Sequence, residues 1–309
     1  MSAFKQDVVA GLSESPRWLP CKYLYDAKGS ELFEQICDTD DYYVTRADLE
    51  IHQNQIAEVA ELIGTNAHII EFGSGSGIKT ELLLDSLKSP RAYTPIEISK
   101  TALDASVAQL EKRFEDLEVQ PLQADYTEDI DPSHLSLDPT ARRRVIYFPG
   151  STIGNFTHDQ AQAFLVRMRR MAGDNGLIFI GVDLIKPVNQ LLRAYDDSAG
   201  VTAQFNTNVL QRMRDELGAQ IDMTAFAHES RFNRDLQRVE MHLVAQTPTT
   251  ITIDEDTFAF GRGESIHTES SHKYSIGGFQ DLAKATGLTP VRHWLDSQTQ
   301  FSMHCLEPA

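Results

Sequence analysis

The sequence predicts an α/β protein in which a parallel sheet is wrapped by helices and a second lobe is built from other parts of the chain. From Thr65 to about Val182, short β-rich runs alternate with longer amphipathic runs, as expected when helices connect parallel strands. From Ile185 to about His272 this alternation is lost, which indicates an insertion. A chain of 309 residues is long enough to bury two cores of modest size, so we predict two domains.

Five strands are predicted in the alternating region. They are Ala67–Phe72, Tyr93–Ile98, Val119–Gln123, Arg144–Phe148 and Leu177–Val182. Ser99 precedes a helix in which apolar residues recur at spacings of four, three and four, and its hydroxyl suits the N-cap. The apolar residues of that helix, which we expect to face the sheet, are Leu103, Val107, Leu110 and Phe114.

The end of the chain is predicted to return to the same sheet. Gly287 is expected to end a helix that runs through Phe279 and Ala283. The segments Val291–Leu295 and Phe301–Leu306 then have the composition of an antiparallel hairpin. Together these elements place residues 47–184 and 274–309 in one domain.

The inserted segment has its own pattern. We predict helices through Leu191–Tyr195 and Asn206–Leu217, and a half-buried strand over 238–245, where apolar residues alternate with polar ones. Asn233–Asp235 suits the hairpin turn before that strand, and Ser265–His272 alternates as a further strand. With the N-terminal residues, which lack sheet-like alternation, the insertion forms a second domain of residues 1–46 and 185–273. We expect the substrate in a cleft between the two lobes.

Composition and charge restrict the function. A net charge of −17 repels phosphate backbones, so we expect a small-molecule substrate and no nucleic-acid partner. With no apolar run of about 18 residues and no signal-peptide order in Met1–Asp7, we expect a cytoplasmic protein without a membrane partner. Cys21, Cys37 and Cys305 lack C-x-x-C spacing, and the ten histidines lack metal-ligand spacing, so we expect neither disulfides nor a metal.

A glycine-rich turn follows the first predicted strand. Glycines at Gly73, Gly75 and Gly77 let a ligand approach the backbone closely. A nicotinamide fingerprint counted from Gly73 needs a glycine where Ile78 stands. The observed pattern from Glu71, E-x-G-x-G-x-G, instead resembles that of S-adenosylmethionine-dependent methyltransferases. Ordinary tight turns also match this pattern.

Polar residues after the next strands complete a candidate cofactor site. Lys79 is placed to pair with a cofactor carboxylate, although a solvated lysine in a first helical turn is an equal alternative. Glu97 ends the second strand, where a carboxylate accepts hydrogen bonds from ribose hydroxyls. Asp125 is placed to meet the adenine amino group and Tyr126 to pack on the base, while a generic turn aspartate remains an alternative reading.

Three sets of residues are candidates for substrate contacts. Asn155 follows the fourth strand and presents an amide donor and acceptor, unless it caps the next helix. In a regular strand His267, Glu269 and Ser271 share one face, and a carboxylate beside a hydroxyl suits a ring with two N–H groups. A solvated sheet face is the simpler alternative.

Four tyrosines offer hydroxyls and electron-rich rings. Such rings suit a substrate whose amine becomes a quaternary cation, although isolated tyrosines more often belong to a core. They are Tyr25, Tyr42, Tyr43 and Tyr195.

Taken in order, seven segments of the sequence resemble the L-histidine Nα-methyltransferases of ergothioneine biosynthesis. The similarity spans nearly the whole chain and is far more specific than a glycine turn. The segments are Tyr23–Phe33, Asp41–Arg46, Glu71–Gly75, Pro149–Asn155, Ala194–Asn206, Arg238–Met241 and Thr268–Ser271.

The resemblance implies a class I, Rossmann-like methyltransferase domain with a second α+β domain, formed by the N-terminus and an insertion, that binds substrate. It implies trimethylation of the α-amine of L-histidine to hercynine, the first step of ergothioneine biosynthesis. The residues it assigns to S-adenosylmethionine are Gly73, Gly75, Lys79, Glu97, Asp125 and Tyr126.

The same resemblance assigns the histidine contacts. Tyr42, Asn155 and Tyr195 bind the α-carboxylate and amino end, and Tyr25 lies near the amine. Glu269 and Ser271 read the imidazole, and Met241 lines the pocket. The catalytic group is Tyr25, Asn155 and Tyr195. Glu97 in place of aspartate, Tyr126 in place of phenylalanine and Pro149 depart from the family pattern, the first two with the chemistry preserved.

Each methyl transfer is an in-line displacement at a sulfonium methyl, so alignment of the amine dominates catalysis. No residue is an obvious strong base, and the Tyr25 hydroxyl or a water beside it is expected to relay the proton. Two alternatives remain: an Nα-methyltransferase for another amino acid or small amine, such as tryptophan, and a non-catalytic S-adenosylmethionine-binding partner protein. We expect a monomer that releases S-adenosylhomocysteine.

Overall fold

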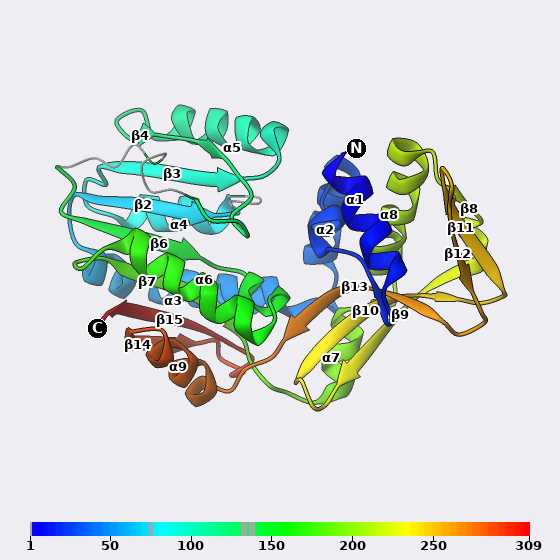
Figure 1. The fold of residues 1–309 in the computed structure, drawn as a ribbon. Coiled ribbons are helices and arrows are strands. Elements are labelled where there is room, and N and C mark those ends of the chain that lie inside the picture. Colours follow the sequence, from blue (N-terminus) through cyan, green and yellow to red (C-terminus); the bar gives the residue numbers. More distant parts are fainter. Residues whose placement is uncertain (1, 74–76, 131–134, 136–139) are drawn as a thin grey trace. The chain divides into compact units, whose positions relative to one another are not determined.

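The computed structural model describes residues 2–73, 77–130, 135 and 140–309 (Figure 1). The chain divides into two compact units. The sheet unit comprises residues 44–185 and 274–309, and the insertion unit comprises residues 1–43 and 186–273.

The sheet unit is built on a mostly parallel sheet. Its strand order is β14-β15-β7-β6-β2-β3-β4, and β5 also pairs with β3. The parallel strands are β2 (Ala67–Phe72), β3 (Ala92–Glu97), β4 (Glu118–Val119), β5 (Leu122–Gln123), β6 (Arg143–Phe148) and β7 (Leu177–Asp183). The antiparallel hairpin of β14 (Leu288–Leu295) and β15 (Phe301–Pro308) completes the sheet beside β7. This arrangement confirms the predicted α/β class, although the third predicted strand is split in two.

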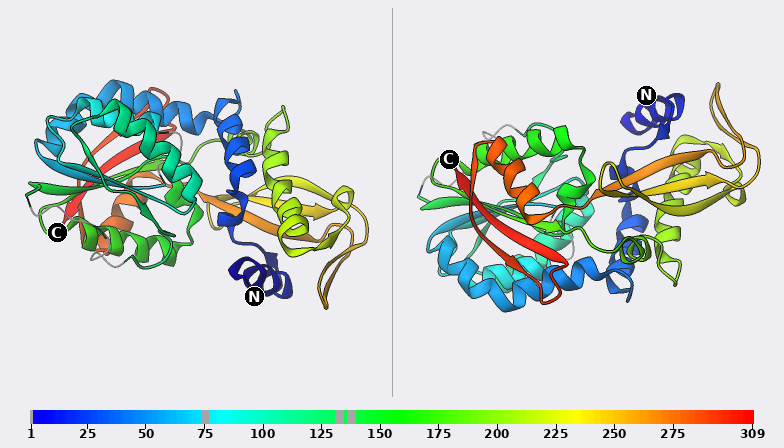
Figure 2. Two further views of the ribbon diagram at one scale, coloured as in Figure 1. Left: turned by 90° about the horizontal axis from the view of Figure 1, so that it is seen from above. Right: turned by 90° about the horizontal axis from the view of Figure 1, so that it is seen from below.

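Helices cover both faces of this sheet. Figure 2 shows α3 (Tyr43–Ile63), α4 (Ile78–Ser86) and α5 (Lys100–Arg113) on one face, and α6 (His158–Ala172) and α9 (Ile276–Ala285) on the other. The predicted cap of α5 is confirmed, because the Ser99 hydroxyl accepts from the Ala102 N–H at 3.4 Å. The C-cap of α9 is Thr286, one residue before the predicted Gly287.

Aromatic rings form much of the core below the carboxyl ends of the parallel strands. Phe148 and Phe164 have ring centroids 5.0 Å apart, and Phe72 lies 5.3 Å from Phe164. All three rings are buried. Such edge-on aromatic contacts stabilise the core beyond the burial of their area. The edge of the sheet that carries the predicted cofactor residues is therefore packed on an aromatic core.

The insertion unit has two small antiparallel sheets and four α-helices among its described residues. The helices are α1 (Ala3–Ser13), α2 (Ala27–Asp38), α7 (Val188–Ala194) and α8 (Val201–Leu217). One sheet has the order β1 (Arg17–Trp18), β13 (Ser265–His272), β10 (Arg238–Ala245) and β9 (Phe226–Asn233), in which only the pair β1 and β13 is parallel. The other has the order β12 (Asp256–Phe260), β11 (Thr249–Ile253) and β8 (Gln220–Ile221). Helix α8 begins five residues before the predicted Asn206, and it contacts α2, β9 and β10.

A β-bulge in β13 overturns one prediction about the substrate residues. Met241 of β10 pairs with Glu269, but the next residue, His242, pairs with His267, so Thr268 is the extra residue. Adjacent residues of β10 point to opposite faces, and their partners do the same. His267 therefore lies on the face opposite Glu269 and Ser271, and the predicted three-residue face was wrong.

The N-terminal turn of α2 requires a glycine. Asp26 caps this helix, and its Oδ1 accepts from the Gly29 N–H at 2.7 Å. A Cβ at Gly29 would lie 1.7 Å from the Leu24 carbonyl oxygen, which is backbone and cannot rotate away. The turn that carries Tyr25 is thus packed directly on Gly29.

We expect Gly29→Ala to lower the free energy of unfolding by about 2 kcal/mol or more, because the new methyl group displaces that backbone. Gly277→Ala in α9 is the matched control, since nothing lies within 4 Å of its added Cβ; it should be neutral or stabilise by about 0.5–1 kcal/mol. Urea denaturation followed by circular dichroism measures both. Equal stability of the two variants would contradict the assigned clash.

Glu71 of β2 is a buried carboxyl group inside the sheet unit. Only 1% of its surface is exposed, and its Oε2 accepts from the Tyr93 hydroxyl at 2.5 Å and the Thr80 hydroxyl at 2.7 Å. Burial raises the pKa of Glu71 to about 7, and the two hydrogen bonds offset only part of this rise. Between pH 4.5 and about 7, Glu71 therefore keeps its proton in the folded protein, whereas the unfolded chain has released it.

The contribution of Glu71 to the free energy of unfolding is therefore largest below pH 4.5, and it decreases as the pH rises to about 7. We expect Glu71→Gln, which cannot titrate, to gain stability relative to the wild type between pH 5 and pH 8, on the order of 3 kcal/mol. Urea denaturation at the two pH values measures the gain, with the exposed Glu115→Gln as control. If the free energies of unfolding of Glu71→Gln and the wild type differed by the same amount at both pH values, Glu71 would ionise normally.

Candidate functional site

The predicted site residues fall on both units. The sheet unit carries Gly73, Lys79, Glu97, Asp125, Tyr126 and Asn155. The insertion unit carries Tyr25, Tyr42, Tyr195, Met241, Glu269 and Ser271. Gly75 lies outside the described residues.

The glycine turn begins directly after β2. Gly73 has a φ of +70° and Gly77, the N-cap of α4, has a φ of +73°, a region in which side chains are strained. A Cβ at Gly73 would lie 3.5 Å from the Tyr126 ring. The turn thus needs glycine for its backbone conformation, and it brings Tyr126 next to the chain at the carboxyl end of β2.

Glu97 and Asp125 lie beyond neighbouring strands at the same edge of the sheet. Glu97 ends β3, and its Oε1 accepts from the Ser99 N–H at 3.1 Å. Burial raises its pKa above the usual value. Asp125 Oδ1 accepts from the Thr127 N–H at 2.9 Å, which is the turn contact considered above and fixes the direction of the carboxyl group. Ligands of open α/β sheets bind at this edge.

Lys79 is held by a buried carboxylate that the sequence did not reveal. Its Nζ lies 2.7 Å from Oδ2 of Asp48, which is fully buried in α3. The same oxygen accepts from the Gly150 N–H at 2.8 Å, and His52 Nδ1 lies 3.3 Å from Asp48 Oδ1. Burial raises the pKa of Asp48, but Lys79 and His52 outweigh it and hold that pKa well below its usual range. The spacing of Asp48 and His52, one helical turn apart, is the only signal of this group in the sequence.

Asn155 ends a short 3₁₀ helix, η3 (Thr152–Asn155), in the loop after β6. It does not cap the following helix. Thr157 caps α6: its hydroxyl accepts from the Gln160 N–H at 3.3 Å, and Gln160 returns a bond to the Thr157 N–H at 2.9 Å. The alternative that Asn155 caps the next helix is therefore wrong.

In the insertion unit, Glu269 and Tyr25 lie together. The Tyr25 hydroxyl donates to Glu269 Oε2 at 3.3 Å. Glu269 is 8% exposed, and burial raises its pKa to about 7, while Tyr25 and Lys273 lower it by less. Among the residues that the structure describes, the carboxyl group accepts one long side-chain hydrogen bond, so it retains acceptor capacity.

Ser271 belongs to a second buried group with Tyr195 and Lys273. Tyr195 donates its hydroxyl proton to Ser271 Oγ at 2.7 Å. Lys273 Nζ donates to Ser271 Oγ at 2.7 Å and to Tyr195 Oη at 2.9 Å. Sequence analysis missed Lys273, although its place two residues after Ser271 on an alternating strand was a usable signal.

The remaining predicted residues also lie in the insertion unit. Tyr42 is buried, with its ring centroid 6.0 Å from that of Tyr195 in an edge-on contact. Met241 is buried and pairs with Glu269 across the sheet. Tyr43 accepts a hydrogen bond from Lys186 at 2.8 Å, and the same ammonium lies over its ring. The Tyr42 ring thus packs against Tyr195, whose hydroxyl belongs to the Ser271 group.

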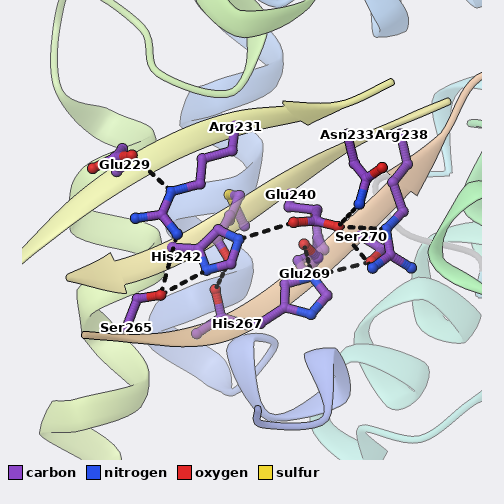
Figure 3. A network of polar contacts seen from close by, with 12 residues as sticks. Glu229, Arg231, Asn233, Arg238, Glu240, His242, Ser265, His267, Glu269 and Ser270 are labelled. Carbon is purple, nitrogen blue, oxygen red and sulfur yellow. Dashed lines mark hydrogen bonds and ion pairs between the residues drawn. The ribbon is translucent and has the colours of Figure 1, made fainter. Parts of the chain in front are cut away.

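The opposite face of β10 and β13 carries a separate polar network, shown in Figure 3. His242 and His267 stack with ring centroids 5.1 Å apart, and His242 Nε2 lies 3.1 Å from Glu240 Oε2. Arg238 and Asn233 also donate to Glu240. Although burial raises the pKa of Glu240, hydrogen bonds led by that of Arg238 lower it to about 2. His267 belongs to this network and is no longer a substrate candidate.

Two features are absent from the described part of the chain. No helix there is long and apolar enough to cross a membrane. No group of three or more histidine, cysteine or acidic residues there is arranged to hold a metal ion.

Known proteins match this chain over almost its full length. A model of the histidine-specific, S-adenosylmethionine-dependent methyltransferases matches residues 4–308. A histidine N-α-methyltransferase of Mycobacterium tuberculosis is 36% identical over 97% of this chain and 94% of its own length. One of Mycolicibacterium smegmatis is 35% identical over the same shares. A 4-dimethylallyltryptophan N-methyltransferase of Aspergillus fumigatus is 26% identical over 95% of this chain and 90% of its own length. The chain therefore belongs to the family of histidine-specific, S-adenosylmethionine-dependent methyltransferases.

Proposed function

We propose that this protein transfers three methyl groups in succession from S-adenosylmethionine to the α-amine of L-histidine and forms hercynine, the first step of ergothioneine biosynthesis. Family membership supports the cofactor and the substrate class. The observation that carries the choice of histidine is the buried pair of Glu269 and Ser271, which offers a carboxylate and a hydroxyl on one face of a sheet.

The sheet unit is assigned to the cofactor. Its glycine turn has the positive φ at Gly73 and Gly77 that glycine adopts readily, and α4 begins directly after it; the N–H groups of a first helical turn suit a carboxylate. Lys79 is assigned to the same carboxylate, Glu97 to the ribose hydroxyls, and Asp125 with Tyr126 to the adenine. When bound, S-adenosylmethionine supplies a methyl group on a positively charged sulfur.

The insertion unit is assigned to substrate recognition. Glu269 and Ser271 are assigned to the imidazole and Met241 to the wall of the pocket. We assign the α-carboxylate and amine of histidine to Tyr42, Tyr195 and Asn155, the last from the sheet unit.

Alignment of the amine with the carbon–sulfur bond is the main catalytic contribution under this proposal. The amine reacts only without its proton. Tyr25 is the assigned relay, and its hydroxyl already donates to Glu269, so it is oriented within the substrate group. Electron-rich rings such as those of Tyr25 and Tyr42 also suit the cationic product.

A different amino acid is the second candidate, because one relative is named for a tryptophan derivative. Glu269 favours a ring that donates an N–H, which both side chains possess, whereas Ser271 adds a second polar contact that only imidazole uses. A non-catalytic binding protein is the third candidate. A cytoplasmic location and a monomeric state remain predictions.

Mass spectrometry separates these candidates. Purified protein is incubated with S-adenosylmethionine and each amino acid in turn, and products are examined for one, two and three added methyl groups. Trimethylated histidine supports the proposal. Methylation of another amino acid in its place supports the second candidate, and bound cofactor without any product supports the third.

We expect Glu269→Gln to raise the KM for histidine by about tenfold or more, because a charged acceptor is replaced by a neutral amide. Affinity for S-adenosylhomocysteine, measured by titration calorimetry, should change little. Glu240→Gln, on the opposite face of the same sheet, is the matched control and should leave the KM for histidine unchanged. An equal loss of cofactor and histidine binding in Glu269→Gln would refute the assignment.

We expect Asn155→Ala to raise the histidine requirement by a similar factor, because the amide offers a donor and an acceptor to the amino-acid end of the substrate. Steady-state kinetics at saturating S-adenosylmethionine measures it. Thr157→Ala, two residues later, tests for loop damage: it removes the helix cap and should cost stability of about 1 kcal/mol without the same change in KM. Wild-type kinetics in Asn155→Ala would remove this residue from the site.

A further inference from the structure

Lys273 is a buried cation in the substrate group of the insertion unit. Only 3% of its surface is exposed. Its backbone N–H donates to the Gln237 carbonyl at 2.8 Å, which extends the sheet one residue beyond β13 and fixes the start of the side chain. Burying an ammonium group is unfavourable unless acceptors and negative charge surround it, so its partners are under strict constraint.

Those partners include the two hydroxyl groups of the candidate site. Nζ lies 2.7 Å from Ser271 Oγ and 2.9 Å from Tyr195 Oη. An ammonium group has three donors and no acceptor, so both hydroxyl oxygens must accept from it. Neither hydroxyl can point its own proton at Lys273.

Ser271 accepts a second time from Tyr195, whose hydroxyl oxygen lies 2.7 Å away. The direction follows from acidity, because a phenol is a better donor than an aliphatic alcohol and a poorer acceptor. A serine oxygen has two lone pairs and one proton. In the described part of the chain these are the two bonds of the Ser271 hydroxyl, so both lone pairs are filled and its proton is the group left to offer.

We propose that Lys273 fixes the Ser271 hydroxyl as a hydrogen-bond donor and thereby makes the site select the neutral imidazole ring, with one N–H and one bare nitrogen. The inference rests on the proposed function, which assigns Glu269 and Ser271 to that ring. Glu269 accepts from the N–H, and Ser271 donates to the bare nitrogen. This replaces the ring with two N–H groups expected from sequence, since a second N–H would face a serine oxygen whose lone pairs are filled.

The charge of Lys273 supports the other half of the pair. It lowers the pKa of Glu269, against the larger rise that burial causes, and so favours the carboxylate as acceptor. One cation thus directs both groups: through two hydrogen bonds it commits Ser271 to donate, and through its charge it favours acceptance by Glu269. Lys273 is a positioning residue in this scheme and does not touch the ring.

The first test uses the wild-type protein and two histidine analogues, pyrrol-2-ylalanine and pyrrol-3-ylalanine, in which one or the other ring nitrogen is a carbon. Each keeps one N–H and loses the bare nitrogen. We expect kcat/KM for both to fall by about tenfold or more relative to histidine, because the Ser271 proton loses its acceptor. A pyrrole analogue that matches histidine would overturn the inference.

The second test is a double-mutant cycle with Lys273→Met, Ser271→Ala and the combined variant. Lys273→Met should raise the KM for histidine by about tenfold with little change in kcat, and it should reduce the discrimination against the better pyrrole analogue. In the Ser271→Ala background the same change should have almost no further effect. A purely structural role of Lys273 would instead give the full loss in both backgrounds and overturn the inference.

Two controls keep this result distinct from failure of the proposed function. S-adenosylhomocysteine affinity and the thermal midpoint of each variant report whether the protein remains folded. If wild-type protein forms no methylated histidine, the proposed function fails before the cycle is measured. If it methylates histidine but the two substitutions act additively, the function stands and the role of Lys273 is refuted.

Discussion

The strand that carries the proposed substrate residues depends on one buried amide, Asn206 of α8. Its Oδ1 accepts from the Thr268 hydroxyl at 2.6 Å, and its Nδ2 donates to the His242 carbonyl at 3.2 Å. The Thr268 hydroxyl also reaches the Met241 carbonyl at 3.1 Å. These bonds satisfy backbone groups beside the bulge, where the regular ladder is interrupted. Without the bulge, Glu269 and Ser271 would share a face with His267. With it, they lie with Tyr25 and Tyr195, and His267 joins the polar network on the other side.

The regular elements were predictable because local pattern determines them. The strands β2, β6 and β7, the cap of α5 and the terminal hairpin follow from alternation, turn residues and capping, each read over a few neighbours. The bulge was not predictable in this way, because it is fixed by Asn206, 62 residues before Thr268 in the chain. Lys273 and Asp48 were missed for a related reason: their spacing from Ser271 and His52 gives a local signal, but it does not show that a charged residue on a strand or helix will be buried.

In the sheet unit, a buried charged group likewise connects separate segments of the chain. Asp48 joins α3 to the first turn of α4 through Lys79 and to the loop after β6 through the Gly150 N–H. Both of these segments follow carboxyl ends of parallel strands, where the cofactor is assigned. A carboxylate with a cation and a backbone donor at hydrogen-bonding distance is stable in the interior, whereas removal of one partner leaves an uncompensated charge. The fold itself thus fixes the position of Lys79. A cofactor carboxylate would bind a lysine that Asp48 has already oriented.

Three buried carboxyl groups differ in the donors that the fold supplies to them. Asp48 has a cation and a backbone N–H, and its pKa lies well below the usual range. Glu71 has two short hydroxyl bonds, and its pKa is about 7. Glu269 reaches the same pKa with one hydroxyl at 3.3 Å. Burial is costly for all three, but the fold supplies Asp48 Oδ2 with a cation and a backbone donor, and Glu71 with neutral donors. Among the described residues, Glu269 has one long hydrogen bond and the nearby charge of Lys273, so under the proposed function a ligand N–H would supply a further donor. Under that assignment, the cost of burying Glu269 in the free protein would be recovered when the ring donates to it.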